Sequence, residues 1–281
     1  MNTVSQTFNW SRFVATLRKE IVENKRTILF AILGIYAFLS MIMIIGNLMV
    51  HNEPVLSYSL KNYAPQKVIF FLFSILICIM PSLAFKNLTT KAGRTSLFTS
   101  PSSTLEKFLV NVLIYVVVAF VMLFVCAQLA DLTRFAILSI FESKDFVVPG
   151  PINFTSIFGN DVTSSFFGGG KYSSVMGLSM LLGLTSNIAI YFFGSVLWRR
   201  LTLLKTLAGV YAFEMILMLI SIPILLTVDM ERFGRWLRGC VENGSFFITL
   251  CIINGTLAII FFALAWRWFK RKDVVSLKWW K

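Results

Sequence analysis

The sequence predicts an all-α integral membrane protein with six transmembrane helices, an N-terminal amphipathic interfacial helix and both termini in the cytoplasm. Three observations lead to this fold class. The chain is 57% hydrophobic and only 14% charged, with a mean hydropathy of +0.78, which is outside the range of soluble globular proteins. It contains six apolar stretches, each near the roughly 20 residues that a spanning helix needs. Its basic residues are also distributed unequally between the two sides of these stretches.

The distribution of charge predicts the orientation. If the chain changes sides at each apolar stretch, the side that holds the N-terminus carries 18 of the 26 Lys and Arg residues. Lys and Arg in short loops are retained in the cytoplasm, so this side is expected to be the inner one. The net charge of +13 is then expected to lie against anionic membrane lipids. Nucleic acid is not an expected partner, because the bases flank apolar segments and form no aromatic-studded groove.

The order of the elements follows from these stretches. Residues 1–26 are expected to form a cytoplasmic amphipathic elbow helix, residues 27–268 the six-helix transmembrane domain, and residues 269–281 a basic aromatic tail. The expected spans are approximately Thr27–Val50, Val68–Phe85, Phe108–Leu132, Val175–Trp198, Leu203–Thr227 and Ser245–Trp268. The connections are expected to be inner loops 86–107 and 199–205, and outer loops 51–67, 133–174 and 228–244.

The elbow is predicted from the segment Phe8–Asn24. Its apolar residues recur at helical spacing, and its charged residues lie away from them. Such a helix is suited to lie in the inner membrane interface. The alternative is a soluble helix that packs on a partner.

The first inner loop contains a helix start. Ser103 and Glu106 form an S-x-x-E capping box, in which each side chain satisfies a free backbone N–H. The third span is therefore expected to begin near Thr104 and to run outward as one long helix. The loop 199–205 is expected to be a tight hairpin, and the sequence ERFGRWLRG in the last outer loop suggests a short surface or re-entrant helix.

Three polar residues are expected at similar depth inside the membrane: Glu214, Asn187 and Asn254. A charge near the middle of a span costs at least about 2.5 kcal/mol. No Lys or Arg lies within the expected spans to pair with Glu214, so its carboxyl group is expected to be protonated. The three residues are either a coupling or substrate-lining cluster, or polar groups that hold helices together. Asn111, Gln128 and Asp131 lie near the ends of the third span and are expected to meet water or headgroups.

Several kinds of catalytic chemistry are excluded by the sequence. His51 is the only histidine, so a Ser–His pair within the bundle and an H-E-x-x-H metal site are both excluded. The four cysteines show no metal-binding spacing, and no metal site is expected. The Gly168–Tyr172 segment lacks the spacing of a phosphate loop. The chain is therefore not expected to be an enzyme, and it should hold no cofactor of its own.

The layout resembles the membrane subunit of ABC-2-type ATP-binding-cassette transporters. The shared features are the amphipathic N-terminal helix, six spans, a helical inner loop between spans two and three, and a very short one between spans four and five. The most specific part is the segment from Ser96 to Phe108, SLFTSPSSTLEKF, which resembles the family's Pro-x-Ser pattern before the third span. The chain departs from the family in placing its longest outer loop between spans three and four.

The resemblance implies a permease subunit of the bacterial plasma membrane, most simply an exporter, that a separate ATPase subunit drives with ATP and Mg²⁺. A second copy or a related permease would complete the pathway. The residues that the resemblance assigns to the ATPase-docking surface are Leu97, Phe98, Pro101, Ser103, Glu106, Lys107, Arg199 and Arg200. Two alternatives remain open: a non-transporting membrane scaffold or sensor, and a proton-coupled carrier that uses Glu214.

Overall fold

The computed structural model describes residues 8–51, 72–88, 93, 95, 102–140, 173–198, 201–227 and 230–278. These residues are helical apart from short turns, and no strand occurs among them. Five helices are long and apolar enough to cross a membrane: Trp10–Gly46, Thr104–Ser139, Val175–Leu197, Thr202–Pro223 and Ser245–Arg271. The chain is therefore a multi-pass helical membrane protein, as its composition predicts.

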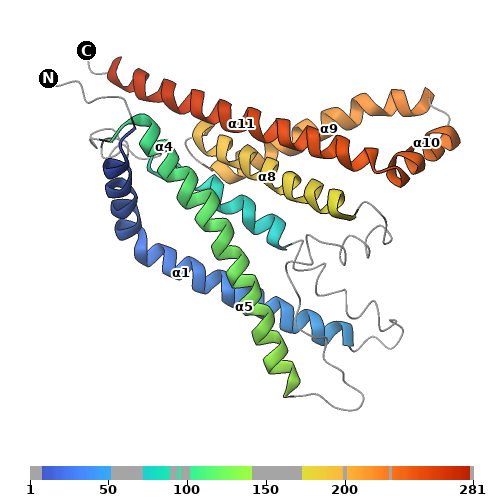
Figure 1. Cartoon of the computed structure of the whole chain (residues 1–281), viewed down its shortest axis with the longest axis horizontal. Helices are drawn as coiled ribbons and strands as arrows, with labels where there is room; N and C mark the ends of the chain where they lie inside the picture. Colours follow the sequence, from blue (N-terminus) through green and yellow to red (C-terminus); the bar gives the residue numbers. More distant parts are fainter. Residues whose placement is uncertain are drawn as a thin grey trace. The chain divides into compact units, whose positions relative to one another are not determined.

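The helices are labelled as in Figure 1. Their bounds are α1 Trp10–His51, η1 Lys86–Leu88, α4 Thr104–Val112, η2 Leu113–Val118, α5 Ala119–Ser139, α8 Ser173–Leu197, α9 Thr202–Thr227, α10 Met230–Glu242 and α11 Ser245–Lys278.

The expected second span is represented by the apolar helix Leu72–Ser82, which is shorter than the other five. Pro81 lies at its end, where an early termination is expected, and the chain continues through a turn into η1. Most of the outer loop 51–67 and the start of this span lie outside the residues that the structure describes. Among the described residues five helices are long enough to span, and the sixth expected span is described only from Leu72 onward.

The expected elbow and first span form one continuous helix, α1. Figure 1 shows that α1 nevertheless bends, because its dark-blue start runs in a different direction from its paler continuation. Asn24 is one of the α1 residues whose side chains bond to a backbone carbonyl of the preceding turn. Its side-chain amide donates a hydrogen bond of 3.0 Å to the carbonyl oxygen of Glu20, the acceptor that the helical ladder also uses. Side-chain insertion of this kind bends helices, and asparagine is a weak helix former.

The third span is a continuous helix made of α4, η2 and α5. It begins at Thr104, directly after Ser103, as the capping box predicts. It reaches Ser139, so the first residues of the expected outer loop 133–174 belong to it. Its middle, η2, is a π-helix. The sequence there is LIYVVV, and β-branched residues crowd the preceding turn of an α-helix, which favours a local departure from α-helical geometry.

The helices divide into two compact units. Unit 1 contains α1, residues 72–77 and the third helix from Leu105 onward, and unit 2 contains residues 78–88, the segment before Leu105 and α8 to α11.

In unit 1, α1 packs against α5 (Figure 1). Leu39 and Met43 of α1 are buried, as are the small residues Ala127 and Ala130 of α5. The Cys126 thiol contacts the carbonyl oxygen of Ile32 at 3.9 Å. Small side chains let two helix backbones approach closely, which is how apolar helices gain packing energy when lipid is the competing partner.

In unit 2, α11 packs along α8, and α8 packs against α9. The crossing of α8 and α9 is very close at Gly194. A Cβ atom at this position would overlap the Thr206 side chain, with the Thr206 Cγ2 atom at 2.8 Å and its Cβ atom at 2.9 Å. Only glycine fits here without a shift of the neighbouring side chain.

The last expected outer loop contains a helix. Residues Met230–Glu242 form α10, with the Phe233 and Trp236 rings 5.9 Å apart, which confirms the short helix suggested by ERFGRWLRG. The expected tail is also helical as far as Lys278, because α11 continues through the basic residues without a break.

Candidate functional site

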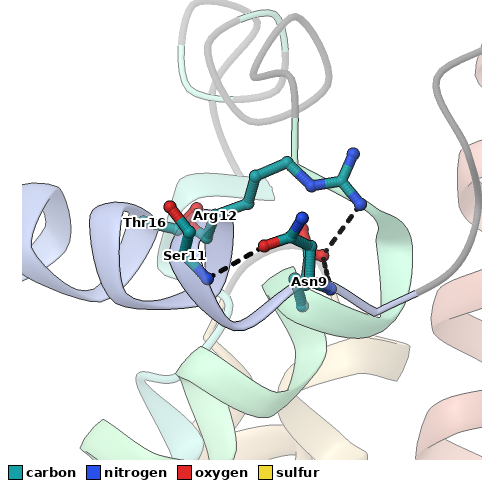
Figure 2. A network of polar contacts seen from close by, with 5 residues as sticks. Asn9, Ser11, Arg12 and Thr16 are labelled. Carbon is teal, nitrogen blue, oxygen red and sulfur yellow. Dashed lines mark hydrogen bonds and ion pairs between the residues drawn. The ribbon is translucent and has the colours of Figure 1, made fainter.

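The best-defined polar site joins the first turns of two helices that are distant in sequence. Three residues form it, Asn9, Arg12 and Glu106, and we call them the Glu106 cluster. The Glu106 side chain is fully buried, and its Oε1 atom accepts a 2.8 Å hydrogen bond from the Asn9 backbone N–H. The same oxygen lies 3.2 Å from the guanidinium of Arg12. Figure 2 shows Asn9, Ser11, Arg12 and Thr16 around this contact.

The local sequence explains why a carboxylate is stable at this point. Asn9 caps α1, because its Oδ1 atom accepts the Ser11 N–H at 2.9 Å and its carbonyl accepts the Phe13 N–H at 3.0 Å. Glu106 lies in the first turn of α4. The starts of two helices, each carrying partial positive charge, therefore meet at one carboxylate together with the Arg12 cation.

Three aromatic residues lie next to Asn9 and Arg12 in the sequence, at the start of α1. The Phe8, Trp10 and Phe13 rings lie 5.4 to 6.3 Å from one another. Phe13 is buried, whereas Trp10 and Phe8 are exposed. Exposed aromatic rings beside basic residues are typical of helices that lie at a membrane surface.

The structure places the expected docking residues in two groups. Glu106, Lys107 and Ser103 are all buried, with Lys107 only 5% exposed. A partner subunit would reach these three side chains only after a rearrangement. The remaining five residues lie outside the described part of the chain: Leu97, Phe98, Pro101, Arg199 and Arg200.

The hairpin between α8 and α9 is fixed by contacts within unit 2. Leu201 has a positive φ of 53°, an unusual conformation for a branched side chain, and its carbonyl accepts the first helical hydrogen bond of α9 from Lys205. The Thr202 hydroxyl donates a 2.8 Å hydrogen bond to the carbonyl of Ser82. The Lys205 ammonium lies 5.4 Å from the centre of the Trp198 ring.

An aromatic cluster lies behind this hairpin. Phe85 contacts Phe192 and Phe269, with ring centres 5.3 and 4.9 Å apart, and Phe192 also contacts Phe262. Phe85, Phe192 and Phe269 are all buried. The segment that leads into the inner loop 86–107 and the hairpin 199–205 therefore belong to one packed body.

The three expected intramembrane residues do not form a hydrogen-bonded cluster among themselves. Asn254 accepts a 3.1 Å hydrogen bond from Ser186, and its amide donates to Leu250 in its own helix. Asn187 is exposed and donates to the carbonyl of Gly183. Glu214 lies on the exposed middle of α9.

A buried ion pair is present where the sequence interpretation expects water or headgroups. Asp131 and Arg134, on one face of α5, are joined by a 2.7 Å contact, and neither side chain is more than 2% exposed. The expectation for Asp131 was wrong, because α5 continues past it to Ser139 and its side chain is buried. Asn111 is also buried, and its amide donates to the Lys107 carbonyl at 2.9 Å.

Sequence reasoning missed Arg12, Asn9, Ser186 and Arg134 as site residues. The i, i+3 spacing of Asp131 and Arg134 was a usable signal, since opposite charges three apart share a helix face. The partners of Glu106 and Asn254 come from other helices, so no local pattern indicates them.

Comparison with protein-family models, with curated proteins and with solved structures gives no match for this chain.

Proposed function

We propose that the chain is the membrane-spanning permease subunit of an ABC-2-type ATP-binding-cassette exporter. In this proposal it lies in a bacterial plasma membrane with both termini inside, and a separate ATPase subunit binds and hydrolyses ATP with Mg²⁺. The chain itself supplies no catalytic residue.

The Glu106 cluster carries the proposal. It ties the amphipathic start of α1 to the first turn of α4, at the C-terminal end of the loop 86–107 that resembles the family's docking loop. A force applied to that loop by an ATPase would reach α1 and the third helix together. A buried, paired carboxylate transmits such a force well, because breaking the pair leaves an uncompensated buried charge.

The contacts of the described residues of the hairpin 199–205 support the same proposal. The hydrogen bond between Thr202 and Ser82 links the hairpin 199–205 to the chain that enters the loop 86–107. The ring contacts of Phe85 with Phe192 and Phe269 add to this link. These contacts would couple movement of the hairpin to the chain that enters the first proposed docking loop. The 18 basic residues on the N-terminal side favour a cytoplasmic position for these loops and contact with anionic lipids.

The exposure of α9 supports a second permease copy, or a related permease, as a partner. Apolar side chains are exposed on nearly every position from Leu207 to Ile220, and Glu214 lies among them. A carboxyl group facing lipid alone is costly, whereas a neighbouring helix offers it a hydrogen-bond partner.

Co-purification tests the proposal directly. The chain is co-expressed with a soluble ATPase encoded beside its gene and captured through a tag on the ATPase. The wild-type chain should be retained. The double substitution Leu97→Ser and Phe98→Ser in the proposed docking loop should abolish retention, because docking would depend on these apolar side chains.

The matched control places the same change on α10, in the proposed outer region. Phe233→Ser with Trp236→Ser removes two exposed aromatic residues but should leave retention of the ATPase unchanged. Equal loss of retention on the ATPase for both double variants, or no retention of the wild-type chain, would count against the proposed permease function. Either result would favour a membrane scaffold or sensor.

A further inference from the structure

Among the helices that the structure describes, α10 separates its charged and apolar residues most sharply, and it connects two spanning helices (Figure 1). A connection of two residues joins the end of α9 at Thr227 to the start of α10 at Met230. A second connection of two residues joins Glu242 to Ser245, where α11 begins. Three steps of about 3.8 Å between Cα atoms cover at most about 11 Å. Both ends of α10 are therefore close to the end of a spanning helix.

This helix is too short to cross the membrane. Its 13 residues measure about 20 Å, whereas the hydrocarbon core of a bilayer is about 30 Å thick. The end of α9 and the start of α11 must then lie at the same membrane surface. Since α10 is tethered to both, it lies along the boundary between hydrocarbon and water.

The turn from α10 into α11 is fixed by its own hydrogen bonds. The Gly239 carbonyl accepts the Asn243 N–H at 3.0 Å, and the Ser245 hydroxyl donates to the Cys240 carbonyl at 3.2 Å. Gly244 has a φ of 70°, the left-handed conformation that commonly ends a helix and that glycine adopts without strain. This turn sets the angle at which α10 leaves α11.

One side of α10 is apolar and open. Phe233, Trp236 and Cys240 follow one another at spacings of three and four residues, which places them on the same side of the helix. The Phe233 and Trp236 rings lie 5.9 Å apart. Both are exposed, and 62% of Trp236 is accessible, so the described part of the chain does not cover this side. Tryptophan is enriched where a protein meets the membrane–water interface.

The charged residues occupy the remaining part of the helix. Glu231 and Arg235 are exposed and four residues apart, and at about 100° per residue they lie opposite Phe233. Arg232 is also exposed, and it lies at the border of the apolar side because it precedes Trp236 by four residues. When the apolar side faces the bilayer, Arg232 lies at intermediate depth and Glu231 faces water.

We propose that α10 is a phospholipid-binding helix on the membrane surface where α9 ends and α11 begins. Phe233 and Trp236 enter the boundary of the acyl chains, and Arg232 and Arg235 bind the phosphate groups of the same leaflet. A guanidinium group presents several N–H donors in a plane and pairs closely with phosphate oxygens. Its long aliphatic stem lets each arginine reach the phosphate level from its place on the helix. The inference depends neither on the proposed transport function nor on which side of the membrane α10 faces.

Collision of spin labels with oxygen and with a nickel chelate measures the depth of each side of α10. The full-length chain is placed in nanodiscs of phosphatidylglycerol and phosphatidylethanolamine, with one label at a time at position 231, 233, 235, 236 or 240 and the other cysteines replaced. The ratio of oxygen to nickel collisions should be at least about fivefold higher at 233, 236 and 240 than at 231 and 235. Equal ratios at all five positions would overturn the proposal, because they would place the helix in water. Few collisions with either reagent at 233 and 236 would overturn it too, since protein would then cover the apolar side.

A fluorophore on Cys240 tests the phosphate contacts. Phosphatidylglycerol with a nitroxide on its acyl chain should quench it at least about twofold more than phosphatidylcholine with the same nitroxide, because choline brings a positive charge of its own. Arg232→Gln with Arg235→Gln should remove this difference. The matched control, Arg18→Gln with Lys19→Gln, removes two exposed bases from α1 and should leave it intact. Equal quenching by the two lipids in the wild-type chain, or a difference that survives the Arg232 and Arg235 changes, would overturn the phosphate contacts.

A measurement on the wild-type chain decides the case in which the cysteine-substituted chain does not fold. A diazirine that dissolves in the hydrocarbon of the bilayer is activated by light, and the labelled residues are located by mass spectrometry. Phe233 and Trp236 should be labelled to an extent similar to Ile259, an exposed residue of the spanning helix α11, whereas Glu231 should not be labelled. Labelling of Ile259 without labelling of Phe233 and Trp236 would overturn the proposal.

Discussion

Unit 1 buries charged side chains in addition to the apolar packing of α1 on α5, whereas unit 2 is held mainly by close apolar packing. In unit 1 the carboxylates of Glu106 and Asp131 are paired with arginines inside the protein. In unit 2 the corresponding contacts are the Gly194–Thr206 crossing and the rings around Phe85. Charge pairs have a direction and fail abruptly when one member is lost, whereas packing is lost gradually with volume. Loss of one charged partner is therefore expected to cost more in unit 1 than the loss of one apolar contact costs in unit 2.

The largest effect is expected at the buried pair in α5. Arg134→Met leaves the Asp131 carboxylate without its cation, and the free energy of unfolding should fall by about 3 to 5 kcal/mol. Unfolding in mixed micelles by increasing dodecyl sulfate measures this loss. The double variant Asp131→Leu with Arg134→Met should lower the free energy of unfolding by less than the single variant does, because no charge remains buried. A double variant that loses more would show that the two charges do not act as a pair.

Glu106→Ala should lower the free energy of unfolding by about 3 kcal/mol, because Arg12 is partly exposed and keeps some hydration after the change. The matched control is Glu23→Ala, which removes the exposed pair with Lys19, 3.8 Å away in the same helix. That control should cost less than about 0.5 kcal/mol. An equal fall in the free energy of unfolding for the two variants would show that burial of Glu106 does not strengthen its contribution to stability.

A smaller effect is expected in unit 2. Gly194→Ala forces the Thr206 side chain to move and should lower the free energy of unfolding by about 1 to 3 kcal/mol. Gly209→Ala, on the open part of α9, meets no atom within 4 Å and should be neutral or raise stability by up to about 1 kcal/mol. If the two glycines respond alike, the tight crossing of α8 and α9 is not real.

The smallest effect is expected for Thr202→Val, which removes the hydrogen bond to Ser82 and keeps the shape of the side chain. The free energy of unfolding should fall by about 1 kcal/mol. Thr256→Val removes a hydroxyl that bonds only to the carbonyl of Ile253 in its own helix, on an exposed position, and should change little. Thermal unfolding of both variants in the same detergent checks the difference.

Sequence reasoning predicted the parts of this fold that depend on local pattern. Apolar length identified the long helices, the capping box located the start at Thr104, and ERFGRWLRG indicated α10. It did not predict the partners of Glu106, because Arg12 lies on another helix and any base in the N-terminal segment was an equal candidate. It did not predict the π-helical segment either, since β-branched runs are common in spanning helices and most remain α-helical.

The Glu106 cluster also constrains the order of events during biosynthesis. Arg12 and the Asn9 N–H emerge from the ribosome long before Glu106 is translated, so both stay hydrated while the first helix inserts. Only when the third helix forms does the carboxylate arrive that accepts from the Asn9 N–H and pairs with Arg12. The start of α1 therefore takes its final position only after Glu106 has been translated, so this contact joins two segments made at different times.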